Sequence, residues 1–200
     1  MTVSRTTSKK KSVARSTKSS PRNVDITAKD DDDRTVYLVG DVDESLIKDV
    51  IERIVTLSEK GPMKPIYLII NTFGGEVDDA FALFDVMKFV AAPIRTVALG
   101  KVMSAGCLIL AAGEKGRRKM GANARLMYHA GWEIATGNVW EMRISLREFE
   151  RMEDQYDKLF ADETKMTLDQ VKLLYADRQI IDRYILPEEC LKLGIIDEII

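Results

Sequence analysis

The strongest constraint on the fold is an alternation of short apolar segments with amphipathic helical ones, which begins near residue 35. Three segments have the composition and boundaries of β-strands, namely 35–40, 65–71 and 94–99. Apolar residues at helical spacing predict helices between them, one from Asp43 or Ser45 to Gly61 and one from Val77 to Val90. Strands joined by such helices form right-handed βαβ units. The sequence therefore predicts an α/β fold with a parallel sheet, in which the continuously apolar second strand is central and buried on both faces.

Two glycine-bearing loops follow the second and third of these strands. They cover residues 71–75 and 100–106, and an almost wholly apolar helix rich in small residues is predicted over 103–112. A short strand over 125–128 runs directly into His129. Because folds of this class bind ligands beyond the carboxyl ends of their strands, we expect both loops and His129 to lie at one functional edge.

The last third of the chain is predicted to be mainly helical. A long helix is expected over Val139–Thr164, followed by shorter ones over 167–175 and 187–193. The long helix carries one apolar stripe, which consists of Met142, Leu146, Phe149, Tyr156 and Leu159. The stripe fits two alternatives equally well, an interface with other subunits or a cover for the sheet of the same chain.

Composition excludes several classes of protein. The 200 residues suffice for one domain with a tail, and apolar runs are too short to span a membrane. Only two cysteines occur, both among aliphatic residues, which indicates buried thiols in a reducing compartment. The single histidine lies far from them, so no metal site is predicted. A phosphate-binding G-x-x-x-x-G-K-[ST] motif is missing from the sequence.

The first 33 residues differ in kind from the remainder. Residues 1–23 contain seven lysines and arginines and no acidic residue, whereas the rest of the chain has 23 basic and 32 acidic residues. So few aliphatic residues cannot offset the entropy of ordering the segment, and 1–33 is predicted to be a disordered tail. A solvated tail, a nucleic-acid-binding arm, a transit peptide and a removable pro-segment remain alternatives. Residues 34–200 are predicted to form a single domain.

Ser104 and His129 are the candidates for nucleophilic catalysis. Ser104 lies at a strand-to-helix turn, where a helix start exposes N–H groups and the small Ala105 and Gly106 allow close approach. His129 is the only imidazole that could act as its base. A plain helix-capping serine and a histidine buried in the core are the structural alternatives.

The remaining parts of such a site are less sharply defined. Gly74 and Gly75 follow a buried strand and offer unobstructed N–H groups to an oxyanion or phosphate, although a tight turn explains them equally well. Three aspartates in the last quarter of the chain, Asp177, Asp182 and Asp197, are candidates for the orienting acid. Spacing alone does not choose among them.

Several blocks in a fixed order give the chain a resemblance to a known family. The blocks are Tyr37–Val42, Ile66–Asn71 with Gly74-Gly75, Phe84–Met87, Gly100–Gly106, Leu110–Gly113, Arg125–His129 and Gly194–Asp197. Over residues 34–200 the chain resembles ClpP, the family of proteolytic subunits of the Clp protease. The resemblance implies a ClpP/crotonase-like α/β fold of repeated βαβ units, in which the long helix is a protruding handle. It also implies Ser104 as nucleophile, His129 as base and Asp182 as the third member of a triad, with oxyanion N–H groups from Gly75 and Ala105.

The same resemblance implies a serine endopeptidase that hydrolyses unfolded polypeptides to short peptides without a cofactor. Its expected partners are further copies of the chain, in heptameric rings stacked to a tetradecamer, and an AAA+ unfoldase such as ClpX or ClpA. Neither a membrane nor a nucleic acid is an expected partner. A cytoplasmic location follows, with an organellar one kept open by the basic tail. The alternatives are a catalytically weak or structural ring subunit and, less favoured, a crotonase-type acyl-CoA enzyme.

The chain departs from the family pattern at several positions. The Ser-Pro-Gly-Gly turn is Thr72-Phe73-Gly74-Gly75, and His-Gln-Pro is His129-Ala130-Gly131. Ile181 stands where the family has an arginine before the catalytic aspartate, and the stretch between His129 and Asp182 is a few residues longer. These departures fall around the substrate cleft and the contacts between rings.

Overall fold

The computed structural model describes residues 33–132, 134–175 and 182–200. The chain divides into two units, Met1–Asp33 and Arg34–Ile200. Almost all described residues belong to the second unit. The tail predicted to be disordered therefore lies outside the described residues, apart from Asp33.

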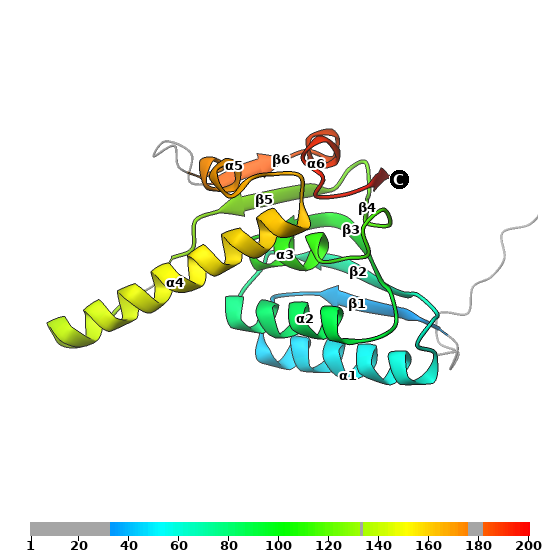
Figure 1. The fold of residues 1–200 in the computed structure, drawn as a ribbon, viewed down its shortest axis with the longest axis horizontal. Coiled ribbons are helices and arrows are strands. Elements are labelled where there is room, and N and C mark those ends of the chain that lie inside the picture. Colours follow the sequence, from blue (N-terminus) through cyan, green and yellow to red (C-terminus); the bar gives the residue numbers. More distant parts are fainter. Residues whose placement is uncertain (1–32, 133, 176–181) are drawn as a thin grey trace, which may run out of the picture. The chain divides into compact units, whose positions relative to one another are not determined.

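One sheet organises this unit (Figure 1). Among the described residues it has seven strands, and its main path runs in the order β1-β2-β3-β4-β7, with β5 pairing β3 and β6 pairing β5. All pairs are parallel except β5–β6, which is antiparallel. The strands are β1 (Thr35–Val39), β2 (Ile66–Thr72), β3 (Ile94–Met103), β4 (Lys119–Met120), β5 (Arg125–His129), β6 (Asp182–Ile185) and β7 (Glu198–Ile199). The predicted α/β class is confirmed, with β2 central between β1 and β3.

The helices begin and end close to where the sequence pattern indicates. They are α1 (Glu44–Lys60), α2 (Val77–Phe89), α3 (Ala105–Ala111), α4 (Val139–Glu163), α5 (Leu168–Leu173) and α6 (Pro187–Leu193). Of the two predicted caps for α1, Asp43 is the one used, because its carboxylate accepts the Leu46 N–H at 2.8 Å. Asn138 caps α4 in the same way, and Glu141 closes a reciprocal capping box.

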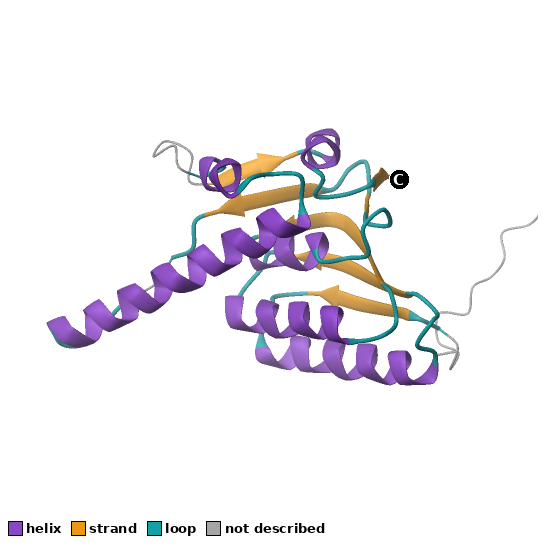
Figure 2. Ribbon diagram, viewed as in Figure 1, coloured by secondary structure: helices purple, strands orange, loops and turns teal. Residues whose placement is uncertain are grey.

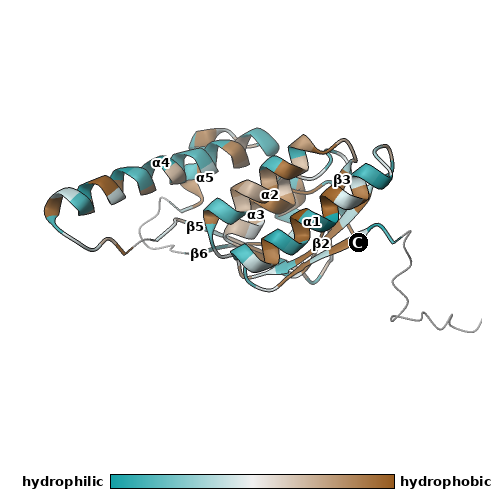
Figure 3. Cartoon of the chain, turned by 90° about the horizontal axis from the view of Figure 1, so that it is seen from below, coloured by the Kyte–Doolittle hydropathy of each residue, from teal (hydrophilic) through white to brown (hydrophobic). Residues whose placement is uncertain are grey.

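Helices cover one face of the central strands and leave the other open (Figures 2 and 3). Along β1, Val36 and Leu38 are buried whereas Tyr37 and Val39 are exposed. The expectation that β2 is buried on both faces is wrong, because its Tyr67 lies on the open face and is 38% exposed. The apolar run of β2 therefore includes side chains that a single copy of the chain leaves uncovered.

Other differences from the sequence prediction concern Gly100 and the shortest strands. β3 does not end at Gly100 but continues to Met103, and α3 starts at Ala105. Gly100 adopts a positive φ of 67°, and the β2–β3 register shifts opposite it, between Ile70 and Thr72. The glycine thus marks an irregularity within the strand. Strands β4, β6 and β7 were not predicted, since two to four residues carry no readable periodicity.

The core lies between the sheet and its helices, and α3 is buried along its whole length. Both cysteines are buried and unbridged, as predicted. Across the described ranges, no helix combines the length and apolar character that crossing a membrane requires. A polar clamp joins β7 to the loop before β4, where Arg118 is only 4% exposed and pairs with Asp197 at 2.8 Å.

We expect Asp197→Asn to destabilise the fold in a pH-dependent way. Burial alone would raise the pKa of the Asp197 carboxyl, but hydrogen bonds from Arg118 and Gly116 outweigh it and hold that pKa below its usual range. The carboxylate thus contributes stability above its unfolded pKa of about 3.9, and that stability is lost as the pH falls through the folded pKa. Leaving Arg118 unpaired should cost about 3 kcal/mol at pH 7.

Urea unfolding followed by circular dichroism at pH 7 and pH 3 checks this expectation. The difference in free energy of unfolding between the wild type and Asp197→Asn should become smaller at pH 3, where the wild-type carboxylate also approaches protonation. A gap of the same size at both pH values would show that the ion pair is not its cause.

Candidate active site

Ser104 lies on a sharp turn between β3 and α3. Its backbone has φ 51° and ψ −126°, and it is the one non-glycine residue with a positive φ in the part of the chain that the structure describes. Strained conformations of this kind persist where the surroundings enforce them, and they cluster at functional sites. Ser104 occupies the capping position of α3, yet its side chain makes no capping hydrogen bond. The capping-serine alternative therefore does not account for it.

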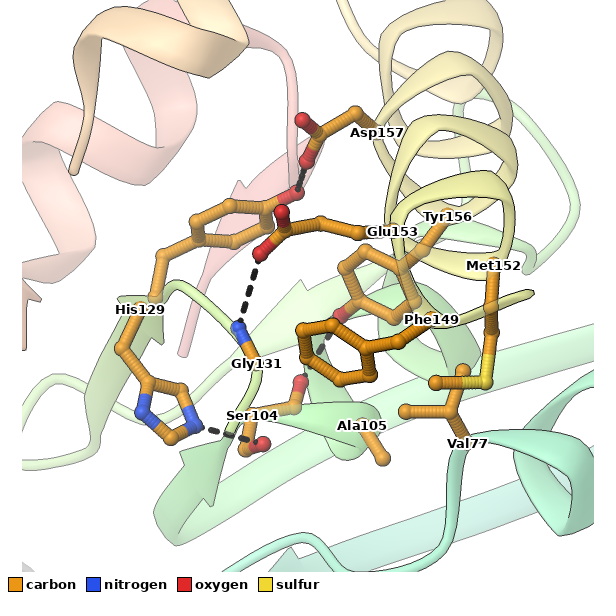
Figure 4. A pocket seen from close by; sticks show the side chains of 11 residues that line it. Val77, Ser104, Ala105, His129, Gly131, Phe149, Met152, Glu153, Tyr156 and Asp157 are labelled. Atoms are coloured by element: carbon orange, nitrogen blue, oxygen red, sulfur yellow. Dashed lines mark hydrogen bonds between the residues drawn. The ribbon is translucent and has the colours of Figure 1, made fainter. Parts of the chain in front are cut away.

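The Ser104 hydroxyl instead contacts the only histidine. Oγ of Ser104 lies 2.7 Å from Nε2 of His129, the last residue of β5 (Figure 4). β5 pairs with the end of β3, and the Ser104 N–H donates to the carbonyl of Met127 at 2.8 Å. The sheet itself thus brings the hydroxyl and the imidazole together. The predicted meeting of the third strand's loop and His129 at one edge is confirmed.

Asp182 is the aspartate that the described residues bring to His129. It stands directly opposite His129 in the antiparallel β5–β6 register, so both side chains project from the same face. Asp182 Oδ1 lies 3.8 Å from His129 Nδ1, which is longer than a hydrogen bond, and its side chain is 45% exposed. Asp197, the second candidate, forms its ion pair with Arg118 instead. Asp177 lies outside the described residues.

The loop after β2 packs closely against the turn that carries Ser104. A Cβ on Gly74 would lie 2.6 Å from Cβ of Ser104. A Cβ on Gly75, whose φ is 151°, would lie 2.1 Å from the carbonyl oxygen of Val42. Glycine is therefore required at both positions. The next residue after Ser104, Ala105, is the first of α3, where N–H groups have no partner within the helix.

Helix α4 supports the site through three hydrogen bonds that sequence analysis missed. The Tyr156 hydroxyl donates to the Ser104 carbonyl at 2.8 Å. Asp157 is 1% exposed and accepts hydrogen bonds from Tyr128 at 2.7 Å and Tyr175 at 2.5 Å. Burial raises the pKa of both phenols, which therefore stay protonated and donate. The strand that carries His129 is thereby tied to α4 and α5.

A small cavity opens beside Ser104 and His129. Its walls come from the start of α2, the serine turn, the segment after His129 and one face of α4 (Figure 4). The residues that line it are Val77, Ser104, Ala105, Tyr128, His129, Gly131, Phe149, Met152, Glu153, Tyr156 and Asp157. Glu153 and Asp157 lie on the same face of α4 as the apolar stripe. Two acidic residues on this apolar face were the sequence feature that could have indicated their part in the site.

The arrangement suits acyl transfer through a serine nucleophile. A hydroxyl bonded to an imidazole, a nearby carboxylate and neighbouring N–H groups are the parts that this chemistry needs. Cys107, three residues after Ser104, is buried, and burial raises the pKa of its thiol well above the usual range, which disfavours a reactive thiolate. Within the described ranges, no group of histidine, cysteine and acidic side chains has the makings of a metal site.

Comparison with known proteins agrees with this chemistry. A family model described as Clp protease matches residues 17–200. The ATP-dependent Clp protease proteolytic subunit of Deinococcus radiodurans is 31% identical over 179 residues, which are 90% of this chain and 86% of that protein. Fold and site thus define a peptidase of the serine type. The chain belongs to the Clp protease family.

Proposed function

We propose that Ser104, His129 and Asp182 form the catalytic triad of this peptidase. His129 removes the proton from the Ser104 hydroxyl as Oγ attacks a peptide carbonyl, and then returns it to the leaving amine. Asp182 orients the imidazole and stabilises its protonated form. The 3.8 Å gap between Asp182 and His129 has to shorten for this role, and the exposed position of Asp182 leaves it room to move.

The oxyanion is bound, in this proposal, by the N–H groups of Gly75 and Ala105. The two groups come from the loops after β2 and β3, which meet at Ser104. N–H groups held in place before the reaction stabilise the developing negative charge at no cost of reorganisation. The strained backbone of Ser104 serves to present Oγ beside them.

The observation that carries this proposal is the 2.7 Å contact between Ser104 Oγ and His129 Nε2 on that strained turn. A crotonase-type acyl-CoA enzyme needs no such pair, and a purely structural ring subunit has no use for it. The first test is hydrolysis of a short fluorogenic peptide by the purified chain. Inhibition by a fluorophosphonate is expected, and hydrolysis that resists it would contradict a serine mechanism.

The proposed working form is an assembly of heptameric rings, stacked to a tetradecamer, that receives unfolded chains from an AAA+ unfoldase such as ClpX or ClpA. The relative from Deinococcus radiodurans is named as a subunit of an ATP-dependent protease, which supports an ATPase partner here. Helix α4 supplies a second argument, because Trp140 and Ile144 lie one turn apart in its first half and are both exposed. Exposed apolar patches of this kind mark partner surfaces. In this proposal α4 is the handle that joins two rings.

Trp140→Glu combined with Ile144→Glu should therefore break the stacked assembly. The like charges would be buried at a two-fold contact without partners, which is strongly unfavourable. We expect the mass by light scattering to fall to that of single rings or smaller, with the helix content by circular dichroism retained. Gln155→Glu, which adds charge at an exposed polar position of α4, serves as the control. An unchanged mass would show that α4 is not the interface.

The remaining parts of the proposal concern the tail and the location of the protein. In this proposal residues 34–200 form the peptidase domain, and residues 1–33, which apart from Asp33 lie outside the described residues, occupy the position of the family's pro-segment. A cytoplasmic location fits two unbridged, buried cysteines.

A further inference from the structure

The cavity beside Ser104 and His129 lies where a substrate side chain would enter, although its volume of about 40 Å³ has to increase to hold one. The cavity is lined by both Ser104 and His129. The substrate side chain closest to it is therefore that of the residue whose carbonyl Ser104 attacks. We propose that Glu153 makes this cavity select substrates in which that residue is lysine or arginine, whose side chains are long and cationic. The inference rests on the triad proposed above and adds the class of substrate that the triad cleaves.

The charged residues that line the cavity are both acidic, and the nearest cation that acts on Glu153, Lys172, is paired with Asp154 at 2.7 Å. Two carboxylates line the cavity, Glu153 and Asp157, and the lining contains no lysine or arginine among the described residues. Asp157 is already satisfied, since each of its oxygens accepts a hydrogen bond from a tyrosine. Glu153 accepts only one, from the Gly131 N–H to Oε1 at 3.0 Å. Its second oxygen has no partner within the described part of the chain and remains available to a donor.

Gly131 fixes the carboxylate where a substrate can reach it. Figure 4 shows Glu153 extending from α4 toward Gly131. This contact depends on a departure from the family pattern, because the third position of His-Gln-Pro is glycine here and proline has no N–H to donate. Glu153 is half-buried, and burial, together with the neighbouring Asp157, raises the pKa of its carboxyl. An incoming cation would relieve both effects.

The other walls suit the hydrocarbon part of such a side chain. Val77, Phe149 and Met152 are apolar, and lysine and arginine bury their methylene stems against such surfaces while keeping the charged head near a polar partner. A methionine or leucine side chain would contact the same apolar walls but would bring no hydrogen-bond donor to the Glu153 carboxylate. Specificity arises from that difference, because a buried polar group left unpaired is costly.

Three fluorogenic peptides that differ only in this residue, arginine, lysine or methionine, test the inference. The wild type should cleave the two basic peptides with a kcat/KM about tenfold or more above that of the methionine peptide. Glu153→Gln should lower kcat/KM for the basic peptides about 10- to 100-fold and leave the methionine peptide within about threefold. Glu150→Gln, which removes a charge from an exposed position of α4 outside the cavity, should leave all three values unchanged.

Two results would overturn the inference while leaving the triad in place. One is a wild type that cleaves the methionine peptide as fast as the basic ones. The other is that Glu153→Gln lowers kcat/KM equally for all three peptides, which would mean that Glu153 only positions Gly131. Mass spectrometry of wild-type digests of unfolded casein, which needs no variant, should show products ending mainly in lysine or arginine. Failure to cleave any peptide would contradict the proposed triad itself.

Discussion

Replacing Ser104 with alanine is expected to lower peptide hydrolysis by about 10⁶-fold, to the background level. The loss is this large because members of a catalytic triad act as a unit, so that His129 has nothing to activate once the hydroxyl is gone. The change removes one oxygen from a partly exposed side chain, and the backbone contacts of Ser104 with Met127, Cys107 and Tyr156 remain. Melting temperature and assembly mass should therefore match those of the wild type.

Ser45→Ala provides the matched control, because Ser45 is exposed in the first turn of α1 and belongs neither to the triad nor to the proposed interface. It should retain full activity in the same fluorogenic assay. Hydrolysis that persists in Ser104→Ala, at a rate above about one-thousandth of the wild type, would end the assignment of Ser104 as nucleophile.

Asp182→Asn should lower kcat by about 10⁴-fold. An asparagine in this position presents an N–H group or a neutral oxygen to His129 Nδ1 and favours the wrong tautomer, although the β5–β6 pairing that places it is unchanged. The effect should appear in kcat with little change in KM, because Asp182 does not line the cavity beside Ser104.

Asp177→Asn is the informative comparison for this assignment. It removes the same charge a few residues earlier and should change kcat by less than about threefold. A large loss in Asp177→Asn together with a small one in Asp182→Asn would transfer the orienting role to Asp177. Equal and small losses in both would mean that Ser104 and His129 work without a carboxylate.

The order of elements from β1 to α3 was predictable because each element is long enough to show its period. Helix α1 repeats its apolar residues over four turns, and β1 and β2 end in readable turns. The β4, β6 and β7 strands have at most four residues and form only where the sheet offers a partner. Their existence is a tertiary property, which a local pattern does not contain.

In the candidate site, too, some residues could be predicted from the local sequence and others depend on tertiary contacts. Ser104 and His129 were found because the carboxyl edge of the sheet concentrates loops and the chain has a single histidine. Asp182 could be selected only through the family resemblance, since its position opposite His129 depends on β6. Glu153 and Asp157 were not predicted, because the stripe on α4 was identified by its apolar residues alone. Their roles arise from contacts with Gly131, Tyr128 and Tyr175, which lie far from them in sequence.

Mapping a fluorophosphonate adduct on the wild-type chain tests the central claim most directly. Trypsin cleavage after Lys101 and Lys115 releases a peptide of residues 102–115, in which Ser104 is the only hydroxyl-bearing residue and Cys107 the only thiol. The account predicts one adduct, on Ser104, with fragment ions that exclude Cys107. It also predicts that His129→Ala suppresses the labelling. An adduct at any other residue, or an unlabelled Ser104 in a chain that hydrolyses peptides, would contradict it.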